Sequence, residues 1–238
     1  MNNSISVKNL TKKYSHFTLD NLSLEVPSGS VIGLVGANGA GKTTLIKLLL
    51  GIIKKDKGNI HIIDKEDIGI ILDDAFLPEL LKINDINKIM KNIYQNWDET
   101  LFYQYLQRFN LTNNLLIKSL SKGMKKKLEI AVSLAHKPKL LILDEPTSGL
   151  DPIVRGEVLD IFREFMESDD HSILISSHIT SDLESIADYI ALLDQGKLIF
   201  KESITNIMDN YGIIHCTKEM FEKLKDNAVS YRKNKYDY

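Results

Sequence analysis

Residues 36 to 43 read GANGAGKT and directly follow the apolar run VIGLV. The three glycines let backbone N–H groups turn inward on an anion, and the segment KTTLIKLLL predicts a helix whose N-terminus adds its dipole. Lys42 can reach the outer oxygens of a polyphosphate, and the Thr43 hydroxyl can hold Mg²⁺. The G-x-x-x-x-G-K-[ST] spacing between a strand and a helix therefore predicts a phosphate-binding loop, and this context disfavours a plain glycine-rich turn.

Two carboxylates follow a second apolar run, in LLILDEP at residues 140 to 146. Adjacent acids at the end of a buried strand are costly unless a cation or a reaction needs them. Asp144 suits a magnesium shell, and Glu145 suits orientation and deprotonation of an attacking water. Taken alone, the segment could be a strand that ends in solvated acids. Beside a phosphate loop it favours phosphoryl chemistry.

Alternating strand and helix patterns must position these groups. Apolar alternation over residues 5 to 35, followed by GNIHII and IGIIL, predicts strands, and residues 42 to 51 predict a helix. From residue 76 to about 136 the apolar period is helical, which predicts a helical insert. Strand and helix patterns then alternate again: the apolar run KLLILD, the helix VRGEVLDIFREFM, the strand SILISS, the helix SDLESIADYIAL and the hairpin LLDQGKLIF. This alternation predicts a mostly parallel sheet.

Composition excludes several classes of protein. The chain has 238 residues, and its 30 Lys and Arg against 32 Asp and Glu leave no global basic field to hold a polyanion. The single cysteine, Cys216, excludes a disulfide framework and a four-thiolate zinc site, which fits a reducing cytosol. No secretion leader and no run of roughly 18 apolar residues is found, so we expect a chain that does not itself span a membrane.

The order of the motifs resembles one known family. The phosphate loop, LSKGM ahead of LLILDEPTSGLDP, and a histidine after ILISS occur as in the ATP-binding subunits of ABC transporters, over residues 5 to 202. The resemblance implies a P-loop NTPase fold of ABC type: α/β, with a mostly parallel sheet core, an antiparallel β part and the helical insert. Residues 1–202 would form this domain, and 203–238 a small C-terminal extension with a mobile end.

The resemblance also implies ATP and Mg²⁺ as ligands, ATP hydrolysis, and a head-to-tail homodimer or heterodimer. Each of two ATP molecules would lie between the phosphate loop of one subunit and the LSGGQ-like signature of the other. Closure of the dimer on ATP, followed by hydrolysis and opening, would drive transport through separate transmembrane permease subunits. The chain would then be cytoplasmic and peripheral on the inner face of the cell membrane.

The family's functional residues map onto this sequence as follows. The phosphate-loop positions are Gly36, Asn38, Gly39, Ala40, Gly41, Lys42, Thr43 and Thr44. Tyr14 matches the aromatic that stacks on adenine, although a lone tyrosine after a strand is more often packing. Ser121 and Gly123 match the signature residues that touch the γ-phosphate across the interface. Asp144 matches the magnesium ligand and Glu145 the catalytic carboxylate, residues 148 to 151 match the loop that links the two sites, and His178 matches the switch histidine.

Two features depart from the family. Asp73 stands where a glutamine usually contacts magnesium and the attacking water, so we expect it in the metal and catalytic set, without the amide's ability to donate. The segment GNIHIIDKEDIGIIL is short, so the antiparallel arm beside the nucleotide is expected to be trimmed. The signature with an acidic residue at position 73 resembles the YtrB-like group and exporters of peptides or antibiotics.

Other functions remain open at this point. A soluble ABC-type ATPase that acts on the ribosome or nucleic acid is the alternative; such proteins usually carry two nucleotide domains, a coiled-coil insert or zinc cysteines, so we expect no nucleic acid partner. A P-loop switch or kinase outside the family leaves LSKGM and His178 unexplained. A permease helix is expected to dock near residues 73 to 100, where Phe76, Leu77, Leu80 and Trp97 could face it, although core packing is favoured for each.

The lysines in SLSKGMKKKLE need a local interpretation. Ser121 is a good N-cap, and its helix is expected to bury one apolar face formed by Met124, Leu128, Ala131, Val132 and Ala135. Lys122 is either close to a phosphate or solvated. Lys125, Lys126 and Lys127 are expected on a solvated flank.

Overall fold

The computed structural model describes residues 2–73, 77–212 and 215–225. It forms two compact units, Met1–Ile204 and Thr205–Tyr238. Phe76 and the end predicted to be mobile lie outside the described residues.

Six strands form the main sheet of the described chain. Their order is β5 (Ile68–Ile71), β6 (Leu140–Asp144), β7 (Ser172–Ser176), β3 (Val31–Val35), β8 (Tyr189–Asp194) and β9 (Lys197–Ser203). All neighbours pair in parallel except β8 and β9, which pair antiparallel. Gln195 and Gly196, both with positive φ, make the tight turn between those two strands. The interiors of the parallel strands are apolar because both faces of the sheet are covered.

Successive residues of these strands enter two different cores. Leu141, Leu143 and Ile173 belong to one core, whereas Leu140 and Ile142 belong to the other. This follows from the two-residue period of a strand, which sends neighbouring side chains to opposite faces. The sheet is therefore the middle layer of the first unit.

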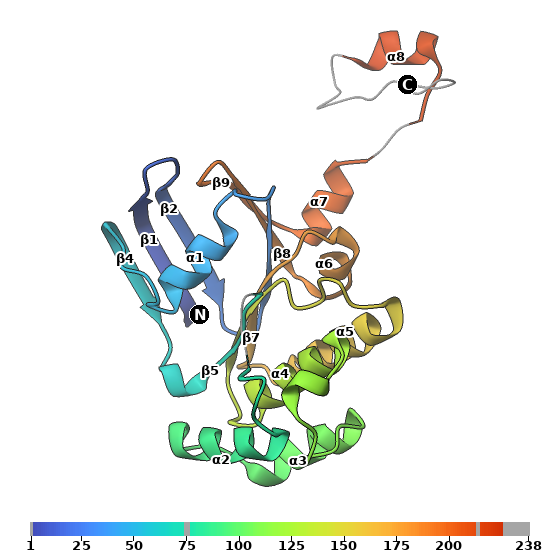
Figure 1. Ribbon diagram of the computed structural model, residues 1–238. Helices are drawn as coiled ribbons and strands as arrows, with labels where there is room; N and C mark the ends of the chain where they lie inside the picture. Colours follow the sequence, from blue (N-terminus) through green and yellow to red (C-terminus); the bar gives the residue numbers. More distant parts are fainter. Residues whose placement is uncertain (1, 74–76, 213–214, 226–238) are drawn as a thin grey trace. The chain divides into compact units, whose positions relative to one another are not determined.

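A smaller antiparallel sheet and helix α1 cover one face. Its strands, in the order β2 (Thr18–Pro27), β1 (Asn3–Lys13) and β4 (Lys57–Ile62), share the second core with α1 (Lys42–Leu49). Figure 1 shows α1 beside these strands. A short 3₁₀ turn, η1 (Lys65–Asp67), then leads into β5.

Helices cover the other face. Here lie α2 (Ile83–Ile93), α3 (Glu99–Arg108), the 3₁₀ turn η2 (Ile117–Ser119), α4 (Lys122–Leu134), α5 (Pro152–Phe165) and α6 (Thr180–Ile186). Helices α2 and α3 lie together at the lower end of the view in Figure 1, and both contact α4. Their helically spaced apolar residues, among them Ile83, Ile86, Phe102 and Leu128, are buried. The second unit carries α8 (Lys218–Leu224) and all but the first residue of α7 (Ile204–Asn210).

The predicted α/β class with a parallel core and an antiparallel part is confirmed. The helix predicted over SDLESIADYIAL is wrong in its second half, because α6 ends at Ile186 and Tyr189–Asp194 form β8. These residues pair in parallel with β3 inside the sheet, and that tertiary pairing overrides a local spacing that also fits a helix.

Candidate functional site

The phosphate loop joins the end of β3 to the start of α1. Gly39 and Gly41 have φ values of 82° and 112°, which a residue with a side chain rarely adopts. A Cβ on Gly41 would lie 2.9 Å from the Phe17 ring, and one on Gly36 would collide with the Leu193 carbonyl oxygen. Conformation therefore favours glycine at Gly39 and Gly41, and close approach disfavours a side chain at Gly36 and Gly41.

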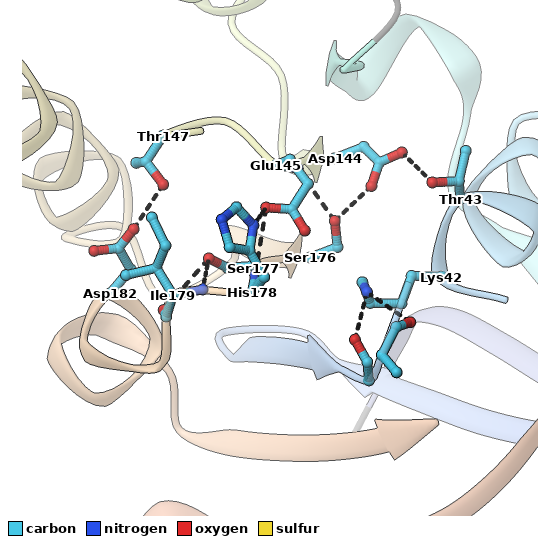
Figure 2. A network of polar contacts seen from close by, with 12 residues as sticks. Lys42, Thr43, Asp144, Glu145, Thr147, Ser176, Ser177, His178, Ile179 and Asp182 are labelled. Atoms are coloured by element: carbon cyan, nitrogen blue, oxygen red, sulfur yellow. Dashed lines mark hydrogen bonds and ion pairs between the residues drawn. The ribbon is translucent and has the colours of Figure 1, made fainter. Parts of the chain in front are cut away.

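Lys42 folds back over this loop. Its side chain is buried, and Nζ donates to the carbonyl oxygens of Gly36 at 2.6 Å and Ala37 at 3.4 Å (Figure 2). These contacts hold a positive charge against the loop, at the N-terminus of α1. Both features favour an anionic ligand there.

Asp144, at the end of β6, is held by two hydroxyl groups. It is 1% exposed; Oδ2 accepts from Thr43 Oγ1 at 2.8 Å, and Oδ1 accepts from Ser176 Oγ at 2.5 Å. Ser176 faces Asp144 across the β6–β7 pair, so the sheet register itself brings the two together. Both carboxylate oxygens of Asp144 are therefore held in place by hydroxyl donors.

Glu145 is the next residue and adopts a left-handed backbone conformation, with φ 51°. Its N–H lies 3.1 Å from Ser176 Oγ, and its Oε2 lies 2.6 Å from His178 Nδ1 and 3.3 Å from the His178 N–H (Figure 2). Because an ionised carboxylate only accepts, the contact places the ring proton on Nδ1. His178, which follows β7, is therefore oriented by Glu145.

Lys42, Thr43, Asp144 and Glu145 line one cleft of about 660 Å³. Ser176 and His178, which contact Asp144 and Glu145, do not line it. Its walls are Tyr14, His16, Phe17, Ala37, Asn38, Gly39, Gly41, Lys42, Thr43, Thr44, Asp73, Asp144 and Glu145. Asp73 follows β5, so the carboxyl ends of β5, β6 and β3 all contribute, as expected for a ligand site of a parallel sheet.

Aromatic residues line part of the cleft. Tyr14, 46% exposed, and Phe17 have ring centroids 6.4 Å apart, and Lys12 Nζ lies 5.6 Å from the centre of the Tyr14 ring. Sequence reasoning missed Phe17 and His16, whose only signal was their place in the turn next to Tyr14. It also missed Ser176, which the serine pair ending ILISS could have suggested.

Ser121 and Gly123 do not line this cleft. Ser121 caps α4, where its Oγ accepts from the Met124 N–H at 3.2 Å. A Cβ on Gly123 would lie 3.6 Å from Val154 of α5, and one on Gly149 would collide with Lys122 Nζ. The signature segment thus packs beside its own chain's residues 148 to 154 and away from its own phosphate loop.

The lysines of α4 differ from the prediction of a solvated flank. Lys126 is buried and pairs with Glu129 at 2.7 Å, so the prediction is wrong for this residue. Lys125 pairs with Glu79 at 2.9 Å, and Lys127 pairs with Glu157. Burial raises the pKa of Glu129, and Lys126 opposes that effect. Lys125, Lys126 and Lys127 therefore each have an acidic partner and do not form a free basic patch.

The oxygen donors at the cleft fit magnesium. Mg²⁺ prefers hard oxygen ligands and usually takes one or two carboxylates together with phosphate oxygens and water. The Thr43 hydroxyl and the Asp144 carboxylate already lie 2.8 Å apart at the mouth of the phosphate loop. The pair can converge on one small cation without rearranging the strands.

A second, more apolar pocket of about 250 Å³ lies between α1, β4, β5 and the end of α2. It is lined by Leu49, Leu50, Ile62, Lys65, Glu66, Ile68, Ile70, Ile93 and Tyr94.

Leu77 and Trp97 pack against the core, whereas Leu80 is 80% exposed. Core packing, favoured from the sequence for each of these residues, therefore holds for Leu77 and Trp97 and is wrong for Leu80.

Within the described ranges, no helix combines the length and the apolar character that crossing a membrane requires.

Comparison with known proteins identifies the family. Residues 19–148 match the family model described as ABC transporter. The lantibiotic transport ATP-binding protein SrtF of Streptococcus pyogenes is 36% identical over 229 residues, which cover 92% of this chain and 99% of that protein. The bacitracin transport ATP-binding protein BcrA of Bacillus licheniformis is 37% identical over 215 residues, 84% of this chain and 69% of that protein.

Two further matches agree with these. YtrB of Bacillus subtilis, whose group the sequence indicated, is 32% identical over 200 residues, 80% of this chain and 66% of that protein. A solved structure of an ATP-binding subunit of an ABC transporter superposes with a TM-score of 0.79 at 26% identity, covering 93% of this chain and 99% of that one. The chain therefore belongs to the ABC transporter family, as one of its ATP-binding and ATP-hydrolysing subunits.

Proposed function

We propose that the cleft binds ATP with Mg²⁺, and that two such subunits close head to tail around two ATP molecules to drive export through separate transmembrane subunits. The second ATPase subunit is a copy of this chain or a related chain. The observation that carries the proposal is the continuous hydrogen-bonded set Thr43, Asp144, Ser176, Glu145 and His178 beside the phosphate loop (Figure 2).

Different groups of the chain would bind different parts of the nucleotide. The loop amides and Lys42 hold the outer phosphates, and Tyr14 with Phe17 offers an aromatic surface for adenine. Thr43 and Asp144, with Asp73 at the edge of the cleft, would hold Mg²⁺. The metal would supply charge neutralisation of the phosphate oxygens.

Glu145 acts on the attacking water. Its Oε2 is occupied by His178, which leaves Oε1 to orient the water and take its proton as the water oxygen bonds to the γ-phosphorus. The bond from that phosphorus to the bridging oxygen breaks, and ADP and phosphate result. Because Nδ1–H donates to Glu145, a second ring proton on Nε2 would let His178 donate to the γ-phosphate as well, and the histidine would then link the state of the nucleotide to the position of Glu145.

Ser121 and Gly123 complete the site of the opposite subunit. Their place on α4, away from their own phosphate loop, supports this assignment. Because the γ-phosphate makes these contacts only in the closed dimer, ATP favours closure and hydrolysis releases it.

The membrane subunit would dock in the apolar pocket at the end of α2, and this chain would then lie on the inner face of the membrane. Exposed apolar residues there, Ile70 and Ile93, offer a surface for a short partner helix.

SrtF is named for lantibiotic transport and BcrA for bacitracin transport. Both names point to peptide antibiotics, and we propose that class as the exported substrate.

Replacement of Glu145 by Gln tests the mechanism. The variant is expected to bind ATP, to accumulate as a closed dimer, and to release phosphate at least about 100-fold more slowly, because the amide cannot accept the proton of the water. Size-exclusion chromatography with ATP and phosphate-release kinetics measure the two effects. Lys42→Ala is the matched control and should lose both dimer and turnover. A Gln variant that turns over at the wild-type rate would remove Glu145 from its role.

A further inference from the structure

Asp182 lies in the first turn of α6 and is buried, with 1% of its surface exposed. Its Oδ2 accepts from Thr147 Oγ1 at 2.6 Å, and its Oδ1 accepts from Arg155 Nε at 2.5 Å. The Arg155 guanidinium also bonds Ser181 Oγ at 2.7 Å. Both carboxylate oxygens are therefore engaged, one of them in a charge-assisted bond.

Asp182 and its two partners, Thr147 and Arg155, come from three different segments of the chain. Thr147 lies just after Glu145, and Arg155 lies in the first turn of α5. Asp182 lies in the first turn after His178 and Ile179, and Figure 2 shows it reaching Thr147 on the side of His178 away from Lys42. Asp182 thus joins the segment after β6 to the segment after β7.

Between Thr147 and Arg155 lies the loop 148 to 151. At its end Asp151 caps α5, accepting from the N–H groups of Ile153 and Val154 at 3.1 Å. Asp182 holds this loop on both sides, through Thr147 before it and Arg155 after it. A shift of the loop would therefore displace α6 and the His178 segment that precedes α6 in the chain.

We propose that Asp182 is a positioning residue that clamps the loop 148–151 to the His178 segment, so that loop movement on dimer closure sets the contact between His178 and Glu145. The inference rests on the proposed function of Glu145 and His178. It assigns Asp182, Thr147 and Arg155 to the hydrolysis step and not to ATP binding, since none of them lines the cleft.

Thr147→Val is the informative variant, because it keeps the shape of the side chain and removes only the hydroxyl. It is expected to lower kcat about tenfold or more while the KM for ATP and the ATP-dependent dimer stay within about twofold of wild type. Thr147→Ser keeps the hydroxyl and should recover most of kcat. Asp182→Asn should lower kcat at least as far, because it removes the charged partner of Arg155.

Arg163→Gln is the matched control, since Arg163 lies on the same helix, pairs with Asp160 and reaches the Ser185 carbonyl oxygen of α6 at 3.5 Å, so that it joins α5 to α6 without binding Asp182. It is expected to keep wild-type kinetics. If Thr147 has only a structural role, both Thr147→Val and Thr147→Ser should lower Tm and the fraction of active protein. In that case kcat would not fall selectively while the KM for ATP stays unchanged. That result, or an unchanged kcat in Thr147→Val, overturns the clamp.

The same assays separate this inference from the proposed function. Lys42→Ala with wild-type ATP binding contradicts the assignment of the cleft itself. Lys42→Ala without ATP binding, alongside Thr147→Val with wild-type kcat, contradicts the clamp alone.

Discussion

Two residues of the site are unusual: Glu145 in its backbone conformation, and Asp73 in standing where the family usually has glutamine. Both lie where chemistry is expected. Glu145 has a positive φ, which is uncommon for a residue with a long side chain and costs on the order of 1 kcal/mol or more. Its backbone N–H is bound to Ser176, whose strand is fixed by the sheet, so the surrounding structure maintains the conformation. The conformation aims the carboxylate at His178, which a regular extension of β6 would not do.

Asp73 is the second departure, and its replacement by Asn tests what the carboxylate does. Asp73→Asn removes one negative charge at the edge of the cleft, so ATP is expected to bind equally well or up to about threefold more tightly. The single-turnover hydrolysis rate is expected to fall at least about fivefold, because a magnesium and water ligand is weakened. Equilibrium nucleotide binding and rapid-quench kinetics measure the two quantities. Asp20→Asn, at an exposed position of β2, is the control, and an unchanged single-turnover rate takes Asp73 out of the mechanism.

At the scale of elements, the sequence predicted what local patterns encode. GANGAGKT and LLILDEP lie on buried strands and their ends, so both the elements and the residues they carry could be placed in advance. Burial of Lys126 could not, since it depends on the i,i+3 partner Glu129 and on the packing of α4. The role of Ser176 could not either, because it depends on which strand lies beside β6. Both missed features depend on tertiary packing: on how α4 is covered, and on which strand lies beside β6.

The ends of three elements meet at one buried histidine. His136 follows α4; its Nε2 lies 3.1 Å from the carbonyl oxygen of Ile68 at the start of β5, and its ring stacks on Tyr94 at the end of α2 with centroids 4.0 Å apart. Burial lowers the pKa of His136. The residue therefore joins the signature helix to the strand that leads to Asp73.

The lowered pKa makes stability depend on pH in a defined direction. The unfolded chain takes up a proton near pH 6.5 and the folded chain only at lower pH, so the contribution of His136 is present above about pH 6.5 and is lost as pH falls toward the folded pKa. One such group gives a slope of up to about 1.4 kcal/mol per pH unit. Urea unfolding at pH 8 and pH 5.5 should show a smaller difference in His136→Phe than in wild type. His61→Gln, at an exposed position, should keep the wild-type difference; equal slopes in all three proteins contradict the assignment.

At the scale of the whole molecule, charge and apolar surface both favour a protein partner. The formal net charge is −2, and each lysine of the run 125 to 127 has an acidic partner, so the chain presents no local excess of positive charge there for a polyanion. The apolar pocket at the end of α2 is instead bordered by Lys65 and Glu66, which can pair with charges flanking an apolar helix. Burial raises the pKa of Tyr94 in its wall, so the phenol stays neutral there.

Ile93→Asp tests that surface directly. Ile93 is 58% exposed at the end of α2, so the aspartate is solvated in the isolated chain and is expected to leave its fold and basal ATPase rate unchanged. Against a docked helix the same charge would be buried without a partner, which is expected to lower the fraction of chain bound to membranes from the native cells at least about tenfold. Ile199→Asp on β9, where Ile199 is 55% exposed, is the matched control and should remain membrane-bound. Membrane binding that is unchanged in Ile93→Asp, or lost equally in both variants, would move the partner's contact away from this pocket.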